Sequence, residues 1–179
     1  MEDHILDGEK ASKLEDESRF KYLSKEELLG DINSQDTVVE VGSGTGFYTD
    51  YIAKKAGKSY AVDFQEEMHD FYRDKGVPEN IELVNSKASN IDIEEADTIV
   101  SLFSFHEIDV EKALKKFSQI LEEDGKLVIY DWSSEGETDE GPPKEKRFNA
   151  DSASEKLENF FDVKFAEERY DTFKVVAKP

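Results

Sequence analysis

The sequence contains no cysteine, few histidines and no long apolar run. The absence of cysteine excludes disulfides, thiolate metal sites and any mechanism with a cysteine nucleophile. The three histidines are His4, His69 and His106, so we expect no metal centre. We expect His4 and His69 to be exposed and without a role. No apolar stretch approaches the roughly 18 residues of a membrane span, and none has the form of a signal peptide. The sequence therefore predicts a soluble, cytoplasmic protein without membrane insertion.

Positive charge is also scarce. The chain has 43 acidic and 23 basic residues, which give a formal net charge of −20 over 179 residues. Such a field repels phosphate backbones and anionic lipid surfaces, so we expect no nucleic-acid partner. A dispersed acidic surface fits a halophilic source, where salt screens the self-repulsion, and it fits an ordinary acidic cytosolic protein equally well. Composition leaves both interpretations open.

The order of the apolar segments predicts the fold. Apolar runs of strand length alternate with amphipathic segments from residue 37 onward, at 37–41, 59–63, 81–85, 97–103 and 126–132. This alternation predicts βαβ units and a parallel, doubly wound α/β sheet.

Residues 110–121 carry an apolar stripe on a 3.6-residue period, which predicts a helix. Asp109 is expected to cap its N-terminus, and Gly125 to follow its end in the left-handed conformation. The last two strand-like segments, 161–168 and 172–177, lie close enough in sequence for an antiparallel hairpin.

The segments that flank this pattern differ from it in composition. Residues 1–34 are polar and helical in character, and predict an N-terminal helical cap on a single globular domain of residues 35–179. Ser133–Asn149 contains acids, glycines and Pro142-Pro143, and predicts a long surface loop that is either functional or disordered. Ser152–Glu155 has the form of a capping box and predicts the start of a short helix.

A glycine-rich segment, VVEVGSGTGFYT at residues 38–49, follows the first predicted strand. Its spacing is G-x-G-x-G, whereas a dinucleotide-binding loop has a glycine where Phe47 stands, and a P-loop would continue with Gly-Lys-Ser/Thr. No cation lies nearby in sequence to offset a pyrophosphate. Asp63 ends the second predicted strand, where a carboxylate can accept hydrogen bonds from ribose hydroxyls. A ligand with ribose but no phosphate therefore fits best.

These segments resemble the class I S-adenosylmethionine-dependent methyltransferases. Glu40–Gly46 is similar to their first motif, Tyr60–Asp63 to their second strand with its ribose-binding acid, Asp97–His106 to their fourth strand and Gly125–Asp131 to their fifth. The resemblance covers nearly the whole chain. It implies a Rossmann-like, seven-stranded sheet with an antiparallel last strand in a three-layer αβα arrangement.

More narrowly, the chain looks like the ubiquinone/menaquinone-biosynthesis-type branch of small-molecule methyltransferases of bacteria and archaea. Members often carry Asp-Trp after the fifth strand, then Gly-Pro-Pro and an arginine, matched by Asp131-Trp132, Gly141–Pro143 and Arg147. The Asn/Asp-Pro-Pro-Tyr motif of amino-group methylation on bases is missing after the fourth strand. This branch implies a small-molecule methyl acceptor, whose identity cannot be read from the sequence.

The resemblance also implies S-adenosylmethionine as the cofactor and assigns its residues. The glycine loop would approach the methionine end, Glu40 would brace the loop, Asp63 would bind the ribose and Phe64 would cover the adenine. Lys87 stands where the family commonly has an aspartate that meets the adenine amine, and lysine cannot accept that hydrogen bond. Adenine recognition would then rest on the Ala88 backbone N–H, with Ser89 or Asn90 nearby. The expected cofactor-binding residues are Glu40, Gly42, Ser43, Gly44, Thr45, Gly46, Asp63, Phe64, Met68, Lys87, Ala88, Ser101 and Leu102.

His106 is the candidate catalytic residue. It follows the fourth strand, where it could act as a general base near neutral pH or simply hydrogen-bond the loop. Trp132 could pack on the substrate or close the core. Arg19 and Arg147 could hold a substrate carboxylate or form surface ion pairs. The expected substrate-binding residues are Arg19, Tyr22, His106, Asp131, Trp132 and Arg147. A non-catalytic protein of the same fold that binds S-adenosylmethionine or S-adenosylhomocysteine and, less favoured, an NAD-dependent oxidoreductase are the alternatives.

Overall fold

The structure, a computed structural model, describes residues 8–179. Within these residues, seven strands form one sheet in the order β3-β2-β1-β4-β5-β7-β6. Strands β1 to β5 pair in parallel, and β7 runs antiparallel to both β5 and β6. The strands are β1 Thr37–Val41, β2 Lys58–Asp63, β3 Ile81–Asn85, β4 Ala96–Leu102, β5 Leu121–Trp132, β6 Asp162–Glu168 and β7 Thr172–Lys178. The expected α/β sheet with an antiparallel end is confirmed.

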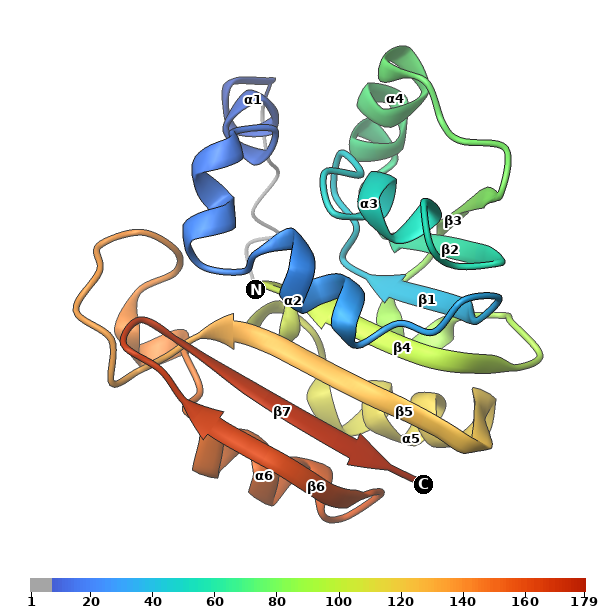
Figure 1. The fold of residues 1–179 in the computed structure, drawn as a ribbon. Helices are drawn as coiled ribbons and strands as arrows, with labels where there is room; N and C mark the ends of the chain where they lie inside the picture. Colours follow the sequence, from blue (N-terminus) through green and yellow to red (C-terminus); the bar gives the residue numbers. More distant parts are fainter. Residues whose placement is uncertain (1–7) are drawn as a thin grey trace.

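Helices cover both faces of the sheet, which confirms the three-layer arrangement. Helices α1 to α4 lie on one side of the sheet, and α5 and α6 lie on the other (Figure 1). The α-helices are α1 Gly8–Leu14, α2 Lys25–Gly30, α3 Thr49–Ala53, α4 Glu66–Lys75, α5 Val110–Ile120 and α6 Ala150–Leu157. Short 3-10 helices are η1 Glu17–Lys21, η2 Ala88–Asn90, η3 Phe105–Glu107 and η4 Lys144–Lys146.

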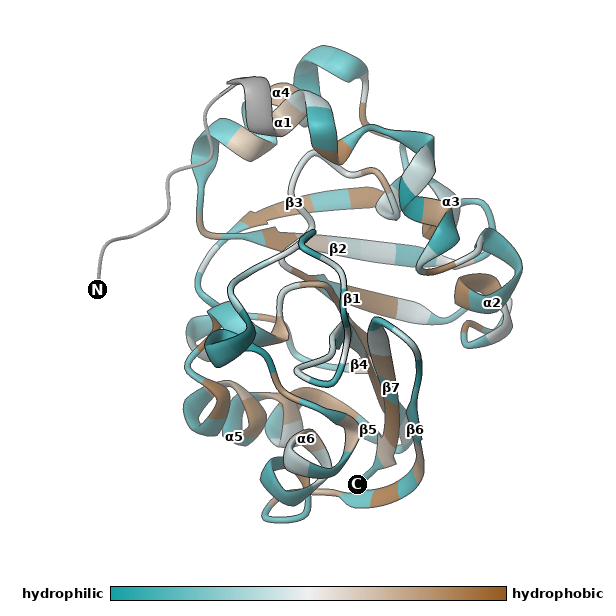
Figure 2. Ribbon diagram, turned by 90° about the vertical axis from the view of Figure 1, so that its left-hand side faces the viewer, coloured by the Kyte–Doolittle hydropathy of each residue, from teal (hydrophilic) through white to brown (hydrophobic). Residues whose placement is uncertain are grey.

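Side chains of the central strands point alternately to the two faces of the sheet, so the core consists of two clusters. Val39 and Leu127 are fully buried in the cluster that includes α5 and α6, whereas their neighbours Val38 and Val128 are fully buried in the cluster that includes α2 and α3. Successive side chains of a strand point to opposite faces, so one sheet supplies both layers. Figure 2 shows the apolar residues gathered in the strands and on the inner sides of the helices.

Three local predictions are wrong. Helix α5 begins after Asp109 as expected, but Leu121 already belongs to β5, and Gly125 is not left-handed. A Cβ at Gly125 would lie 2.8 Å from the Asp97 carbonyl oxygen, so the close approach of β4 explains this glycine. Helix α6 begins at Ala150 with a capping box between Asn149 and Ser152, three residues earlier than predicted. His69, expected to be exposed, is fully buried; His4 lies outside the described residues.

Residues 8–34 and the long loop are both structured. Leu23 and Leu28 of the N-terminal segment are fully buried in the same cluster as Val38 of β1. The loop after β5 contains η4 and a parallel bridge between Ser133 and Phe148. Across residues 8–179, no helix combines the length and apolarity that a membrane crossing requires.

Candidate active site

The sheet order reverses between β1 and β4, because β2 and β3 lie on one side of β1, and β4 and β5 on the other. In open α/β sheets, ligands bind outside the carboxyl ends of the strands at such a switch point. The predicted residues near 42–46, 63, 101–106 and 131–132 all follow or end these strands. The fold therefore brings the two halves of the predicted site to one edge.

The glycine loop after β1 is held in left-handed conformation. Gly42, Gly44 and Gly46 have φ of 72°, 55° and 84°. A Cβ at Gly42 would lie 2.4 Å from the Ser104 Cβ, and one at Gly46 would lie 2.3 Å from the Tyr72 ring. Two of the glycines are thus required by neighbouring side chains as well as by the backbone conformation. Neither Ser104 nor Tyr72 was predicted, since nothing in the local pattern marks them.

Asp63 links the end of β2 to the loop. Its carboxylate accepts hydrogen bonds from the Gly44 N–H at 2.9 Å and the Gln65 N–H at 2.9 Å. Burial raises the pKa of Asp63, and the two backbone hydrogen bonds oppose that rise. Beside it, the Phe64 ring is 41% exposed while Met68 is buried. An acceptor-rich side chain and an accessible aromatic face therefore stand together at the end of β2.

Other predicted cofactor residues surround the loop. Glu40 is buried and accepts a hydrogen bond from the Thr49 hydroxyl, and burial raises the pKa of Glu40 to about 7. The Ser43 hydroxyl oxygen is buried and has no hydrogen-bond partner among the described residues. The Thr45 hydroxyl donates to Glu15. Lys87 is exposed at the start of η2.

The end of β4 is tied to the end of β1 by hydroxyl groups. The Ser104 hydroxyl donates to the Val41 carbonyl oxygen at 2.7 Å, and the Ser101 and Ser104 oxygens lie 2.9 Å apart. Ser101 and Leu102 are themselves buried, as is Ala88 in η2. These contacts fix the position of η3, which carries His106.

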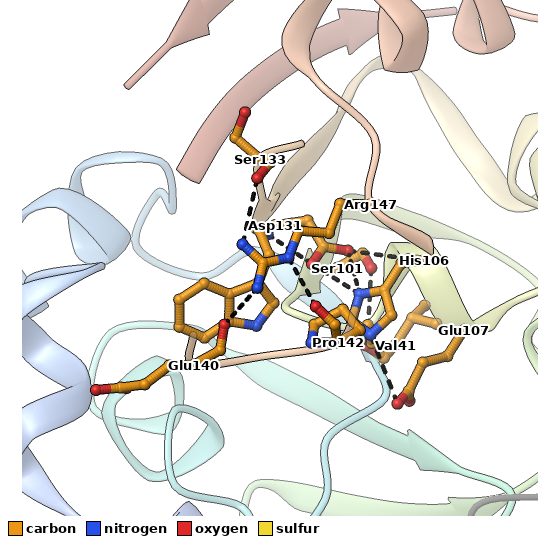
Figure 3. A network of polar contacts seen from close by, with 11 residues as sticks. Val41, Ser101, His106, Glu107, Asp131, Ser133, Glu140, Pro142 and Arg147 are labelled. Carbon is orange, nitrogen blue, oxygen red and sulfur yellow. Dashed lines mark hydrogen bonds and ion pairs between the residues drawn. The ribbon is translucent and has the colours of Figure 1, made fainter. Parts of the chain in front are cut away.

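His106 forms a close pair with Asp131. Its Nδ1 lies 2.8 Å from Oδ1 of Asp131, and its backbone N–H donates to Oδ2 at 3.0 Å (Figure 3). The Asp131 side chain is 1% exposed, and Nε2 of His106 lies 3.6 Å from a Glu107 carboxylate oxygen. Burial lowers the pKa of His106, but the hydrogen bonds with Asp131 and Glu107 outweigh it and raise the pKa to about 9. The imidazole is therefore mostly protonated at neutral pH, and any base chemistry is moved to higher pH than expected.

An aromatic cluster links Trp132, which follows Asp131, to the N-terminal segment. The Trp132 ring lies 4.6 Å from the Tyr22 ring and 5.1 Å from the Phe103 ring, measured between centroids. The Tyr22 hydroxyl lies 3.4 Å from the Thr138 hydroxyl in the long loop. The Arg19 guanidinium carbon lies 4.7 Å from the Tyr48 ring centroid. The structure thus brings Arg19, Tyr22 and Trp132 together.

Arg147 holds the long loop in place. It donates to the carbonyl oxygens of Pro142 at 2.8 Å, Thr138 at 3.1 Å, Glu140 at 2.7 Å and Ser133 at 3.4 Å. Its side chain is buried, and Figure 3 shows its hydrogen bonds to the loop carbonyls. Because the guanidinium N–H groups already donate to these carbonyl oxygens, Arg147 positions the loop.

Comparison with known proteins identifies the family. Residues 39–129 match a family model described as a methyltransferase domain. A solved S-adenosylmethionine-dependent methyltransferase from Aquifex aeolicus is 31% identical, covers 97% of this chain and 98% of its own, and superposes with a TM-score of 0.86. The chain belongs to the S-adenosylmethionine-dependent methyltransferases. This membership decides against the NAD-dependent oxidoreductase.

The cofactor of the methyltransferase is S-adenosylmethionine. The residues at the carboxyl edge fit it. Asp63 offers carboxylate oxygens at the end of β2, Phe64 presents an exposed ring, and the Ser43 hydroxyl is buried without a protein partner. These features suit a ribose, an adenine and a polar amino-acid group, respectively. The individual contacts remain predictions.

Curated relatives match the methyltransferase over part of their length. An uncharacterised methyltransferase of Bacillus cytotoxicus is 31% identical over 112 residues, which are 59% of this chain and 52% of that protein. A probable ribosomal RNA small subunit methyltransferase A of Pyrococcus furiosus is 35% identical over 71 residues, 40% of this chain and 26% of that protein. The chain thus spans between about a quarter and a half of these relatives.

Proposed function

We propose that this methyltransferase transfers a methyl group to a small-molecule acceptor bound against the His106–Asp131 pair. The observation that carries the proposal is the 2.8 Å contact between His106 Nδ1 and Asp131 at the edge that also holds the glycine loop. A buried carboxylate that orients an imidazole is a common arrangement for a general base. The pair lies at the ends of β4 and β5, beside the cofactor residues of β1 and β2.

Each residue then has a definite role. When bound, S-adenosylmethionine would supply an electrophilic methyl group to a lone pair of the acceptor and would leave as S-adenosylhomocysteine. Residues 42–46 and Asp63 hold the cofactor. His106, when neutral, takes the proton that the acceptor loses, and Asp131 stabilises the resulting imidazolium. Trp132 and Tyr22 shield the acceptor from water.

Two observations favour a small acceptor. Trp132, which follows Asp131, packs against the Tyr22 ring at 4.6 Å and lies 5.9 Å from the Arg147 guanidinium carbon, so other parts of the chain cover the end of β5. The net charge of −20 repels a phosphate backbone. We also propose that residues 1–34 act as a cap over this region. A separate proposal concerns the branch of the family: Asp131-Trp132, Gly141–Pro143 and Arg147 support the ubiquinone/menaquinone-biosynthesis-type branch.

Ribosomal RNA is the second candidate acceptor, favoured by the relatives that carry that name. A methyl-transfer assay with labelled cofactor separates the candidates, using a small-metabolite extract in one arm and ribosomal RNA in the other. We expect label in the metabolite fraction. Label in RNA alone would contradict the small acceptor. S-adenosylhomocysteine binding without transfer to either fraction would favour the non-catalytic binding protein.

A further inference from the structure

Arg19 is a cation enclosed by aromatic rings. Its guanidinium carbon lies 5.0 Å from the Phe47 ring centroid, 4.7 Å from that of Tyr48 and 6.0 Å from that of Phe103. One terminal nitrogen donates to the Leu14 carbonyl oxygen at 2.8 Å. Burial lowers the pKa of Arg19, so its surroundings oppose the charge more than they compensate it.

The other arginines of the chain each have carboxylate or several carbonyl partners. Arg73 lies 2.7 Å from both Glu66 and Asp70, and Arg169 contacts Glu27 and Glu167. Arg147 donates to the carbonyls described above. Within residues 8–179, no carboxylate forms an ion pair with Arg19. Arg19 is partly buried, and charges that are drawn out of water are ordinarily paired, so the shortage of acceptors at Arg19 needs an explanation.

The carboxylates that act electrostatically on Arg19 have other hydrogen-bond partners. Glu40 and Glu15 are the carboxylates whose charges act on Arg19. Glu40 accepts from the Thr49 hydroxyl, and Glu15 accepts from Thr45 and lies 3.1 Å from the Lys75 ammonium. The rings contribute cation–π stabilisation but no hydrogen-bond acceptor in the plane of the guanidinium.

We infer that Arg19 binds the carboxylate of a ligand at this site. The rings that enclose it come from both halves of the edge, since Phe47 and Tyr48 follow the glycine loop and Phe103 follows β4. A planar guanidinium offers paired N–H groups that match a carboxylate. Within the proposed function, on which this inference rests, the carboxylate belongs either to the methionine end of the cofactor or to an acidic acceptor.

The first arm of the test measures the cofactor. Wild type and Arg19→Gln are titrated calorimetrically with S-adenosylhomocysteine and with 5′-methylthioadenosine, which lacks the amino-acid group. If Arg19 binds the cofactor carboxylate, the substitution weakens S-adenosylhomocysteine binding by about tenfold to a hundredfold and leaves methylthioadenosine unchanged. Arg19→Lys, which keeps the charge but not the paired geometry, should lose less.

The second arm measures an acidic acceptor. Protein saturated with S-adenosylhomocysteine is titrated with benzoate and with its uncharged analogue benzamide. If Arg19 binds the acceptor, wild type prefers benzoate, Arg19→Gln loses that preference, and S-adenosylhomocysteine affinity stays unchanged. Arg73→Gln, an exposed arginine far from these rings in sequence, is the matched control and should behave as wild type in both arms.

A loss confined to either arm supports the inference and names the source of the carboxylate. Arg19 variants that melt like wild type and bind all four probes as wild type does overturn it, while the proposed function stands. A wild-type protein that binds neither S-adenosylhomocysteine nor methylthioadenosine overturns the proposed function and the inference together. Should Arg19→Gln fail to fold, Arg19→Lys carries the same comparison.

Discussion

The two halves of the site at the carboxyl edge of the sheet differ in composition: one consists mainly of backbone and the other of side chains. On the β1–β2 side, the site consists mainly of backbone: left-handed glycines and one carboxylate, Asp63, that accepts from two backbone N–H groups. On the β4–β5 side it consists of side chains from distant segments, such as Tyr22, His106 and Arg147. The first half lies within residues 40–88, whereas the second extends from the N-terminal segment to the long loop.

The two halves therefore differ in how many substitutions they tolerate. A site made of backbone conformation binds one cofactor and tolerates few changes, because a side chain added to the loop collides with its neighbours. A site made of side chains can be altered without changing the fold, and a fold hosts many functions in this way. We therefore expect substitutions in the two halves to separate cofactor binding from acceptor chemistry.

The largest effect is expected at His106. His106→Gln removes the proposed base, so kcat/KM should fall by about 10² to 10⁴, which is typical of general base catalysis. S-adenosylhomocysteine affinity, measured by calorimetry, should not change, since the cofactor half is intact. A variant that methylates at the wild-type rate would show that the acceptor gives no proton to His106.

The pH dependence sharpens this prediction. Because the pKa of His106 is raised to about 9, the base is increasingly available as the pH rises, and kcat/KM should climb until about pH 9. Asp131→Asn removes the carboxylate that raises this pKa, so the plateau should move to lower pH while the maximum rate also falls. A pH profile that Asp131→Asn leaves unshifted would contradict the pairing.

The next effect is expected in the cofactor half, at Gly46. Gly46→Ala places a Cβ 2.3 Å from the Tyr72 ring at a φ of 84°, and should destabilise the protein by about 2–4 kcal/mol, combining overpacking with backbone strain. Gly76→Ala is the control, since Gly76 has a φ of 100° but open space around its Cβ position. Chemical denaturation should show a smaller loss there. Equal losses would mean that backbone strain alone matters.

Arg147 should have a smaller effect, confined to the acceptor half. Arg147→Gln removes hydrogen bonds to the carbonyls of residues 133–142, and should cost about 1–3 kcal/mol of stability. Hydrogen exchange should increase in the loop, and the acceptor KM should rise. The exposed neighbour Lys146→Gln is the control. An unchanged loop in Arg147→Gln would show that other contacts hold it.

The same comparison explains which parts of the site were predictable from sequence. The strands, α5 and the glycine loop follow from apolar periodicity and from spacing within short segments, and these predictions are confirmed. The partners that make Gly42 and Gly46 necessary are Ser104, just before η3, and Tyr72 of α4, and no local pattern indicates them. Backbone conformation is a local property, whereas side-chain contacts depend on the tertiary arrangement.

Two of the incorrect predictions concern buried positions. The sequence predicts a helix end at Gly125, but the approach of Asp97 from the neighbouring strand determines that position. His69 lies in a polar stretch of α4, yet it is buried with both ring nitrogens unpartnered among the described residues. At both positions burial in the tertiary fold overrides the local pattern, whereas Asn149 and Ser152 set the start of α6 locally.

The smallest effect is expected at Lys87, where the cofactor half departs from its family's pattern. Lys87 is exposed at the start of η2, next to the buried Ala88. Lys87→Asp introduces an acceptor for the adenine amine and should tighten S-adenosylhomocysteine binding by about threefold to tenfold, the value of one additional hydrogen bond. Lys87→Ala, which removes the lysine without adding an acceptor, separates a gained hydrogen bond from the loss of positive charge. If both variants bind equally, the adenine amine does not reach this position, and adenine recognition rests on the backbone of η2.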